Sequence, residues 1–321
     1  MILAGDAGGT KSNLGLFDTK SGKLVRVAHK HYPSKEHAGF EEIVRDFVAT
    51  QNESQITAAS FGIAGAVVSN RVRAANLPWV VDGAKLAALL KLTRVKIIND
   101  VEATAYGISA LEPSELVELH AGVDAPEANR AVIAAGTGLG EAVLVWDGGR
   151  HVPMATEAGH TDYAPHTEQQ AELWKFIKTR GEFVSTESVL SGRGFQVLHE
   201  FLAPGAAHPG FENPAMDPAP EITRRGMTGE CAACAAALDL WVEIYGAEAG
   251  NLALRSVARG GMYVAGGIAV KILPKLRDGR FAAAMKHKEK LAAFLDAIPI
   301  RVVLNEECPM LGAAYVAWKG L

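Results

Sequence analysis

The most constraining feature of this chain is a glycine-rich segment near its start, AGDAGGTKS at 4–12. It satisfies the phosphate-binding P-loop pattern G-x-x-x-x-G-K-[ST] except that Thr10 stands where the second glycine belongs. A P-loop must open a helix, whereas the residues that follow here alternate roughly between polar and apolar and then enter a turn cluster at 19–23. The segment therefore predicts a β-hairpin with Gly8 and Gly9 at its tip, where backbone N–H groups can approach an anion closely.

A second stretch, 130–149, repeats this pattern of strand, Gly-Thr turn, alternating strand and Asp-Gly turn. A third glycine pair, Gly266 and Gly267, closes another apolar strand and precedes a predicted helix. A lone Gly-Thr-Gly or Ala-Gly-Gly segment is usually only a tight turn, so the order of the three carries the inference. Two related hairpins, one per domain, can face one polyphosphate from opposite sides, and the third turn suits a backbone site beside a purine.

Composition limits the class of partner. The chain has 321 residues, of which 49% are hydrophobic, and its formal net charge is −4. This balance argues against nucleic acid and acidic membranes as partners. The sequence shows no secretory leader pattern and no apolar run long enough to span a bilayer, so we expect a cytoplasmic location.

Three cysteines, an odd number, argue against a disulfide framework and suit a reducing compartment. Cys231 and Cys234 form a C-x-x-C motif, which is compatible with a redox pair or half of a metal site. The surrounding run is alanine-rich and helical, with no second cysteine pair and no histidine cluster nearby. The sequence favours small packing residues on a helix face.

Strand-like and helix-like segments alternate along the first hundred residues, which predicts an α/β sheet. The expected elements are a helix at 39–51, a strand at 58–64, a helix at 83–92, a buried strand at 95–98 and a helix at 101–111. A segment rich in Pro, Gly and Ala, 203–220, predicts a loop without an assigned function.

At this point the chain resembles the sugar kinases of the actin-like ATPase superfamily and, within it, the bacterial-type glucokinases. The resemblance covers nearly the whole length. Its motifs are GDAGGT at 5–10 and AGTGLG at 135–140 for phosphate, VAGGI at 264–268 for adenosine, IIND at 97–100 for the catalytic aspartate, and EAGHTD at 157–162 and ESVLSG at 187–192 for sugar.

The resemblance implies an α/β fold of two actin-like (ribonuclease H-like) domains with an interdomain active-site cleft. The implied boundaries are a small domain at 1–110 plus 301–321 and a large domain at 111–300. The final helix, 309–318, would then return to pack on the N-terminal domain, and a homodimer is implied.

The implied reaction is ATP-dependent phosphorylation of glucose to glucose 6-phosphate, with Mg²⁺ and with Asp100 as general base. From the residues alone, Asp100 is as well explained as the N-cap of the next helix. Predicted sugar contacts are Asn99, Asp100, Glu157, His160 and Glu187, although each also has an ordinary reading as a loop or helix-end residue. Predicted nucleotide contacts are Asp6, Gly8, Gly9, Thr10, Gly136, Thr137, Gly138, Gly266 and Gly267, with Asp6 holding Mg²⁺ directly or through water.

Two positions depart from the family pattern. Ala158 replaces a glycine and Arg193 replaces a proline, which leaves fine sugar specificity open. A related sugar-kinase group carries a cysteine-rich zinc segment after its catalytic histidine; no such segment follows His160, so no structural zinc is expected. The rival hypothesis is a sugar-responsive regulator or an actin-like ATPase that is not a kinase.

Overall fold

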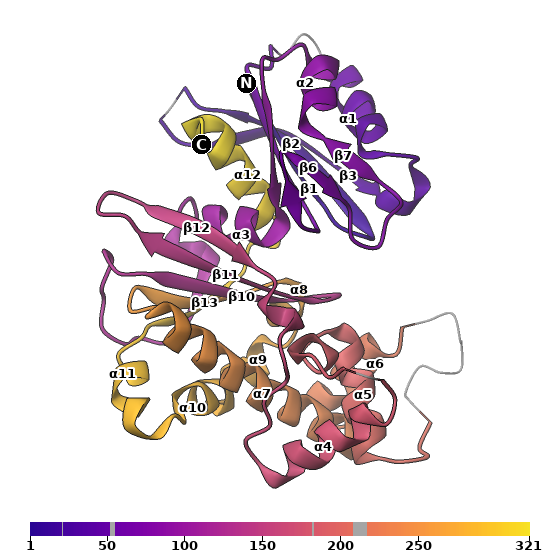
Figure 1. The fold of residues 1–321 in the computed structure, drawn as a ribbon, viewed down its shortest axis with the longest axis vertical. Helices are drawn as coiled ribbons and strands as arrows, with labels where there is room; N and C mark the ends of the chain where they lie inside the picture. The colour runs from indigo at the N-terminus through magenta and orange to yellow at the C-terminus, as the bar shows by residue number, and fades with distance from the viewer. Residues whose placement is uncertain (21, 52–54, 182, 208–216) are drawn as a thin grey trace. The chain divides into compact units, whose positions relative to one another are not determined.

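The computed structural model describes residues 1–20, 22–51, 55–181, 183–207 and 217–321 (Figure 1). The chain divides into two compact units, which are described separately here. Unit 1 comprises Met1–Glu115, Val152–Ala155 and Asn305–Leu321, and unit 2 comprises Leu116–His151 and Thr156–Leu304. The chain leaves unit 1 after Glu115 and re-enters it at Asn305, a few residues later than the boundaries predicted from sequence at 110 and 300.

Unit 1 is built on a sheet in the order β3-β2-β1-β4-β8. Strands β1 (Ile2–Ala7), β2 (Lys11–Asp18) and β3 (Val25–Pro33) are antiparallel neighbours, whereas β4 (Ala58–Ile63) and β8 (Val95–Asn99) run parallel to β1. The expected first hairpin is therefore confirmed, and no helix follows the glycines.

The two faces of this sheet are covered by different helices because side chains alternate along each strand. Leu3 and Ala7 of β1 pack with α1 (Phe40–Ala49) and α2 (Gly83–Leu90), whereas Ile2 and Ala4 pack with α12 (Cys308–Lys319). Helix α3 (Asp100–Ile108) shares the second face and packs along α12 (Figure 1). The C-terminal helix thus returns to the N-terminal unit, as expected. A small antiparallel sheet of β5 (Val67–Val68), β6 (Arg71–Arg73) and β7 (Val80–Asp82) completes the unit.

Unit 2 contains most of a six-stranded sheet in the order β12-β11-β10-β13-β14-β9. Strands β10 (Arg130–Ala135) and β11 (Leu139–Trp146) form the second predicted hairpin, and β13 (Gly261–Ala265) runs parallel to β10. The remaining strands are β9 (Leu116–His120), β12 (His151–Thr156) and β14 (Ile300–Val303). Because β14 pairs with both β13 and β9, the chain leaves unit 2 only after this strand.

Helix α7 (Ala232–Ser256) is the centre of the unit 2 core, with Trp241 and Tyr245 fully buried. The Tyr245 hydroxyl donates to the Ile133 carbonyl at 3.2 Å, which fixes α7 against β10. The other helices are α4 (Glu168–Lys178), α5 (Gly192–Leu202), α6 (Ala219–Thr228), α8 (Gly267–Lys271), α9 (Leu273–Leu276), α10 (Arg280–Lys286) and α11 (Ala292–Asp296).

Of the predicted loop at 203–220, residues 208–216 lie outside the described part, and α6 already begins at Ala219. Among the described helices, none combines the length and apolarity that crossing a membrane would require.

Candidate active site

Asp6 lies at the end of β1, on the sheet face that α3 and α12 cover. Its strand neighbours are Asn13 on β2 and Gly62 on β4. A Cβ atom added to Gly62 would lie 3.9 Å from Asp6 Oδ1, 3.7 Å from Asp100 Cα and only 2.8 Å from Ala103 Cβ. The missing side chain at Gly62 therefore lets the start of α3 pack closely on the sheet and brings Asp100 near Asp6.

The pKa of Asp6 is raised by its burial and by the proximity of Asp100. Burial and the negative charge of Asp100 raise it to about 7, against the lowering effect of a hydrogen bond with the Asn13 side chain. Like charges at short range disfavour ionising both carboxyl groups, so Asp6 is substantially protonated near neutral pH. A divalent cation at this position would relieve the repulsion.

Asn99, not Asp100, is the N-cap of α3. Its side-chain oxygen accepts from the Val101 N–H at 2.8 Å and from the Glu102 N–H at 3.2 Å, and the Glu102 carboxylate accepts in return from the Asn99 N–H. The N-cap alternative for Asp100 was therefore wrong, because the helix begins one residue earlier than expected. The Asn99 amide also donates to the Gly65 carbonyl at 3.1 Å, which leaves one of its N–H bonds for a ligand.

The first glycine turn, which joins β1 to β2, is braced from one side by Ser34. The Ser34 hydroxyl donates to the Gly8 carbonyl at 2.8 Å, and its N–H donates to the Thr10 carbonyl at 3.0 Å. The Gly8 N–H closes the turn on the Lys11 carbonyl at 3.0 Å. Gly8 and Gly9 are half-buried and Thr10 is exposed, so the turn is both rigid and accessible.

In unit 2, the second glycine turn is tied to a predicted sugar-binding segment. Glu187 lies in the short helix Thr186–Ser188, and its Oε2 accepts from the Leu139 N–H at 2.8 Å, directly after Gly138. The Gly192 N–H, at the start of α5, donates to the Gly136 carbonyl at 2.9 Å. The two motifs at 135–140 and 187–192 are thus one structural cluster.

The second predicted sugar-binding segment joins the same cluster. Glu157 precedes the short helix Ala158–His160, and His160 Nδ1 lies 4.0 Å from Glu187 Oε1. Glu157 and His160 are exposed, and Glu187 is half-buried. These side chains offer carboxylate oxygens and imidazole nitrogens in one place, which suits the recognition of sugar hydroxyls.

The third glycine turn lies beside the second. Gly266 adopts φ 88° and ψ 156°, a conformation open essentially only to glycine, and an added Cβ would lie 2.4 Å from the Ala135 carbonyl oxygen. Gly267 follows as the first residue of α8 and has open space around its Cα. The predicted phosphate and adenosine turns therefore share one edge of the sheet.

Two residues that shape the surroundings of Asp6 were not predicted from the sequence. Gly62 sets the separation of Asp6 and Asp100, and Asn13 hydrogen-bonds to Asp6. A glycine inside a strand pattern is a sign of close approach, so Gly62 had a usable signal. Asn13 had none, because only the hairpin register places it opposite Asp6.

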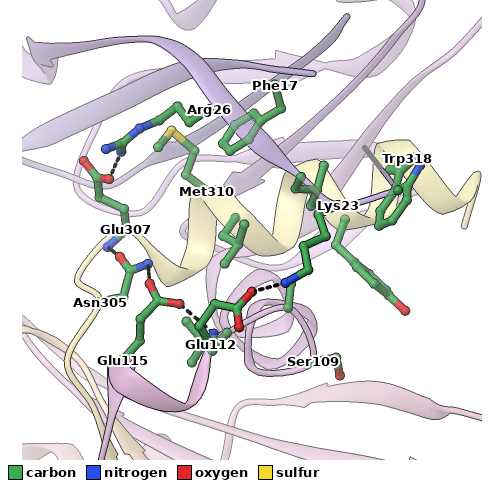
Figure 2. A pocket seen from close by; sticks show the side chains of 16 residues that line it. Phe17, Lys23, Arg26, Ser109, Glu112, Glu115, Asn305, Glu307, Met310 and Trp318 are labelled. Atoms are coloured by element: carbon green, nitrogen blue, oxygen red, sulfur yellow. Dashed lines mark hydrogen bonds and ion pairs between the residues drawn. The ribbon is translucent and has the colours of Figure 1, made fainter. Parts of the chain in front are cut away.

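Unit 1 also holds a pocket of about 450 Å³ that contains none of these residues (Figure 2). It lies beside α12, and its charged groups are paired with one another. Lys23 donates to Glu112 at 2.8 Å, Asn305 donates to Glu115 at 2.6 Å, and Arg26 pairs with Glu307. The charged side chains that line the pocket already pair with one another or with Asn305, so the pocket is not the candidate active site.

Comparison with known proteins gives consistent matches. The family model described as Glucokinase matches residues 3–319. A glucokinase of Nostoc sp. is 35% identical over 337 aligned residues, covering 99% of this chain and 98% of that protein.

Two solved structures show the same fold. The glucokinase of an Antarctic psychrotroph is 28% identical, with a TM-score of 0.86 and coverage of 99% of this chain and 98% of that one. The glucokinase of Balamuthia mandrillaris in complex with glucose is 22% identical, with a TM-score of 0.84 and coverage of 99% and 93%. The fold is thus the two-domain, actin-like α/β fold of sugar kinases. Because the family model matches residues 3–319 and a curated glucokinase is 35% identical over 99% of the chain, this chain belongs to the glucokinase family.

Proposed function

We propose that this protein transfers the γ-phosphoryl group of ATP to the 6-hydroxyl of glucose, with Asp100 as the general base. The observation that carries the proposal is the pair of carboxyl groups, Asp6 and Asp100, held together across Gly62 in a chain of the glucokinase family. Phosphoryl transfer needs positioning, charge neutralisation and one group that accepts the proton of the attacking hydroxyl.

Asp100 is suited to accept that proton. It is the first residue of α3, directly beyond the carboxyl end of the parallel strand β8, where α/β sheets bind ligands. Asn99 is the N-cap of α3, and Asp100 Oδ1 also accepts from the Val101 N–H at 3.0 Å. The 6-hydroxyl would lose its proton to the Asp100 carboxylate as its oxygen attacks phosphorus and ADP leaves.

Asp6 is the proposed magnesium residue, binding the ion directly or through water. The fit rests on the two carboxyl groups, Asp6 and Asp100, that Gly62 brings close together. Burial first and the charge of Asp100 second raise the pKa of Asp6 to about 7, and a divalent cation would favour its ionised form. When bound, Mg²⁺ supplies charge neutralisation on the phosphate oxygens. We expect Asp6→Asn to raise the Mg²⁺ concentration needed for half-maximal turnover.

Unit 2 supplies the remaining proposed contacts with sugar and nucleotide. Glu157, His160 and Glu187 would hold sugar hydroxyls, and the unit 1 residue Asn99 would contribute its remaining N–H. The turn at 136–138 would bind phosphate and the turn at 266–267 would bind adenosine. In unit 1, the turn at 8–10 carries the other proposed phosphate contacts.

The alternative from the sequence was a sugar-responsive regulator or an actin-like ATPase that is not a kinase. Such proteins need nucleotide binding but have no use for a carboxylate placed to accept a sugar proton. The carboxyl pair and the family match both favour the kinase. A cytoplasmic location and a homodimer are further parts of the proposal, and sedimentation velocity tests the second.

The test is a panel of sugars assayed with Mg·ATP, with the products identified by phosphorus NMR. Glucose should give a 6-phosphate, and 6-deoxyglucose should raise the melting temperature without releasing ADP, because it can fill the site but has no hydroxyl to phosphorylate. Mannose, glucosamine and fructose measure the tolerance at the sugar contacts. A product phosphorylated at another position, or ADP release with 6-deoxyglucose equal to that with glucose, would contradict the proposal.

A further inference from the structure

Three side chains that the proposed function does not use lie together in unit 2. They are His199 on α5, Cys231 at the N-cap of α7 and Cys234 in the first turn of α7. The imidazole nitrogen and the two sulfur atoms all lie within 4.8 Å of one another. Cys234 is fully buried, His199 is 2% exposed and Cys231 is half-buried.

The sequence favoured simple packing for the two cysteines, and the structure corrects this interpretation. Cys231 is not on a helix face but caps α7, and the structure records a disulfide between Cys231 and Cys234. The odd number of cysteines had argued against a disulfide. The unpaired third cysteine is Cys308, which is buried in unit 1. The histidine that the sequence lacked nearby comes from α5, more than thirty residues earlier.

We propose that, when Cys231 and Cys234 are reduced, this cluster binds a thiophilic divalent cation of the Zn²⁺ class. Two thiolates and one imidazole are ligands that Zn²⁺ prefers, and a site with three protein ligands keeps a fourth position for water. Cys231 is the most exposed of the three side chains. The site is separate from the segment after His160, where the related sugar-kinase group carries its zinc residues.

The start of α7 favours the thiolate form that a metal requires. Cys231 Sγ accepts the Cys234 N–H at 3.1 Å, and α7 is 25 residues long, so its N-terminus carries a partial positive charge beside the sulfur. A sulfur at a helix N-terminus loses its proton more readily than a free cysteine. Binding releases the thiol protons as the two metal–sulfur bonds form.

The packing of α5 on α7 holds the histidine in place. Phe195, one turn before His199, stacks on Trp241, two turns after Cys234, with ring centroids 4.8 Å apart. The two helices therefore run antiparallel, and His199 faces the first turn of α7. A site built between two packed helices is more rigid than one on a loop, which limits the reorganisation that binding requires.

The disulfide and the metal site exclude each other. In the disulfide, neither sulfur carries the negative charge that a metal ligand needs. A phosphine reductant converts one state to the other: the S–S bond breaks, each sulfur gains a proton, and phosphorus takes the oxygen of water to become a phosphine oxide.

The test is a cobalt titration of the full chain after reduction with a phosphine and removal of metal with a chelator. The reduced parent should bind about one Co²⁺ per chain with thiolate-to-cobalt absorption, and Zn²⁺ should abolish that absorption by displacement. The oxidised chain should bind none. Metal content after dialysis, measured by mass spectrometry, gives an independent count.

Cys231→Ser is the informative variant, because serine is a favoured N-cap and keeps the start of α7. It should lower the affinity for Co²⁺ at least about tenfold and weaken the thiolate absorption. Cys308→Ala is the matched control and should bind like the parent. If Cys231→Ser does not fold by circular dichroism, His199→Asn takes its place. No binding by the reduced parent, which would leave a redox pair only, or equal binding by the folded variant, would overturn the proposal.

Discussion

The hairpins of unit 1 and unit 2 have the same topology but carry different chemistry. In each, two antiparallel strands join at a glycine turn and a third strand runs parallel to the first. In unit 1, Asp6 pairs with Asn13 one position before the strand end; in unit 2, the corresponding position is Ala134, which pairs with Gly140. One scaffold thus presents a carboxyl group in unit 1 and a neutral backbone turn in unit 2.

This difference favours different roles for the two hairpins. The carboxyl pair of unit 1 suits proton and cation chemistry, because burial and the negative charge of Asp100 together raise the pKa of Asp6. The turns of unit 2 are proposed to bind phosphate and adenosine through backbone groups. The nearest carboxylate to the first of these turns, Glu187, accepts a hydrogen bond from the Leu139 N–H. The one strongly perturbed carboxyl group of the unit 2 hairpin, Glu141, points instead into the core beside α7.

The largest expected effect is on catalysis by the carboxyl pair of unit 1. Asp100→Asn removes the proton acceptor while keeping the size of the side chain, so kcat should fall by about 10² to 10⁴. Glucose should still raise the melting temperature of the variant, because binding does not require proton transfer. Near-parental turnover would remove Asp100 from the mechanism, and loss of the glucose-induced shift would make it a binding residue instead.

A smaller effect tests the unit 2 turns. Gly266→Ala places a Cβ 2.4 Å from the Ala135 carbonyl in a conformation reserved for glycine, so it should lower the free energy of unfolding by at least about 1–3 kcal/mol. Gly136→Ala is the matched control: nothing lies within 4 Å of an added Cβ and φ is not positive, so stability should stay near that of the parent. Urea unfolding measures both, and equal losses would mean that the turn is not tightly fixed.

The third prediction concerns the pH dependence of stability and the buried carboxyl group of unit 2. Glu141 is 0% exposed, and among the described residues neither of its carboxylate oxygens accepts a hydrogen bond. Burial and the nearby Glu248 raise its pKa from 4.5 to about 8. The folded state therefore keeps a proton that the unfolded state releases, and this contribution to stability, full below pH 4.5, is lost as pH rises towards 8.

Glu141→Gln should flatten the decline of the free energy of unfolding with rising pH. The limiting slope of that decline is about 1.4 kcal/mol per pH unit. The variant should raise the melting temperature most at pH near 8. The exposed Glu172→Gln is the control and should leave the pH profile unchanged. Parallel profiles for the parent and Glu141→Gln would show that this carboxyl group is not the source of the pH dependence.

The sequence predicted the hairpins well because glycine turns flanked by period-two patterns are local signals. It failed where tertiary context decides. Asn99 and Asp100 are both good N-caps, so the sequence could not assign the helix start to one of them. The approach of Asp6 to Asp100 depends on the parallel register of β1 and β4 around Gly62, which no local pattern encodes. The pairing of His199 with the C-x-x-C motif likewise arises only from the packing of α5 on α7.

The most direct test of the kinase account is ADP release from Mg·ATP by the parent chain, with and without glucose. We predict release that depends on glucose and is close to background without sugar, because water is a poor substitute for a positioned hydroxyl. Release at the same rate without sugar, or none with glucose, would contradict the account and leave a nucleotide-binding protein in which Asp100 has no proton to accept.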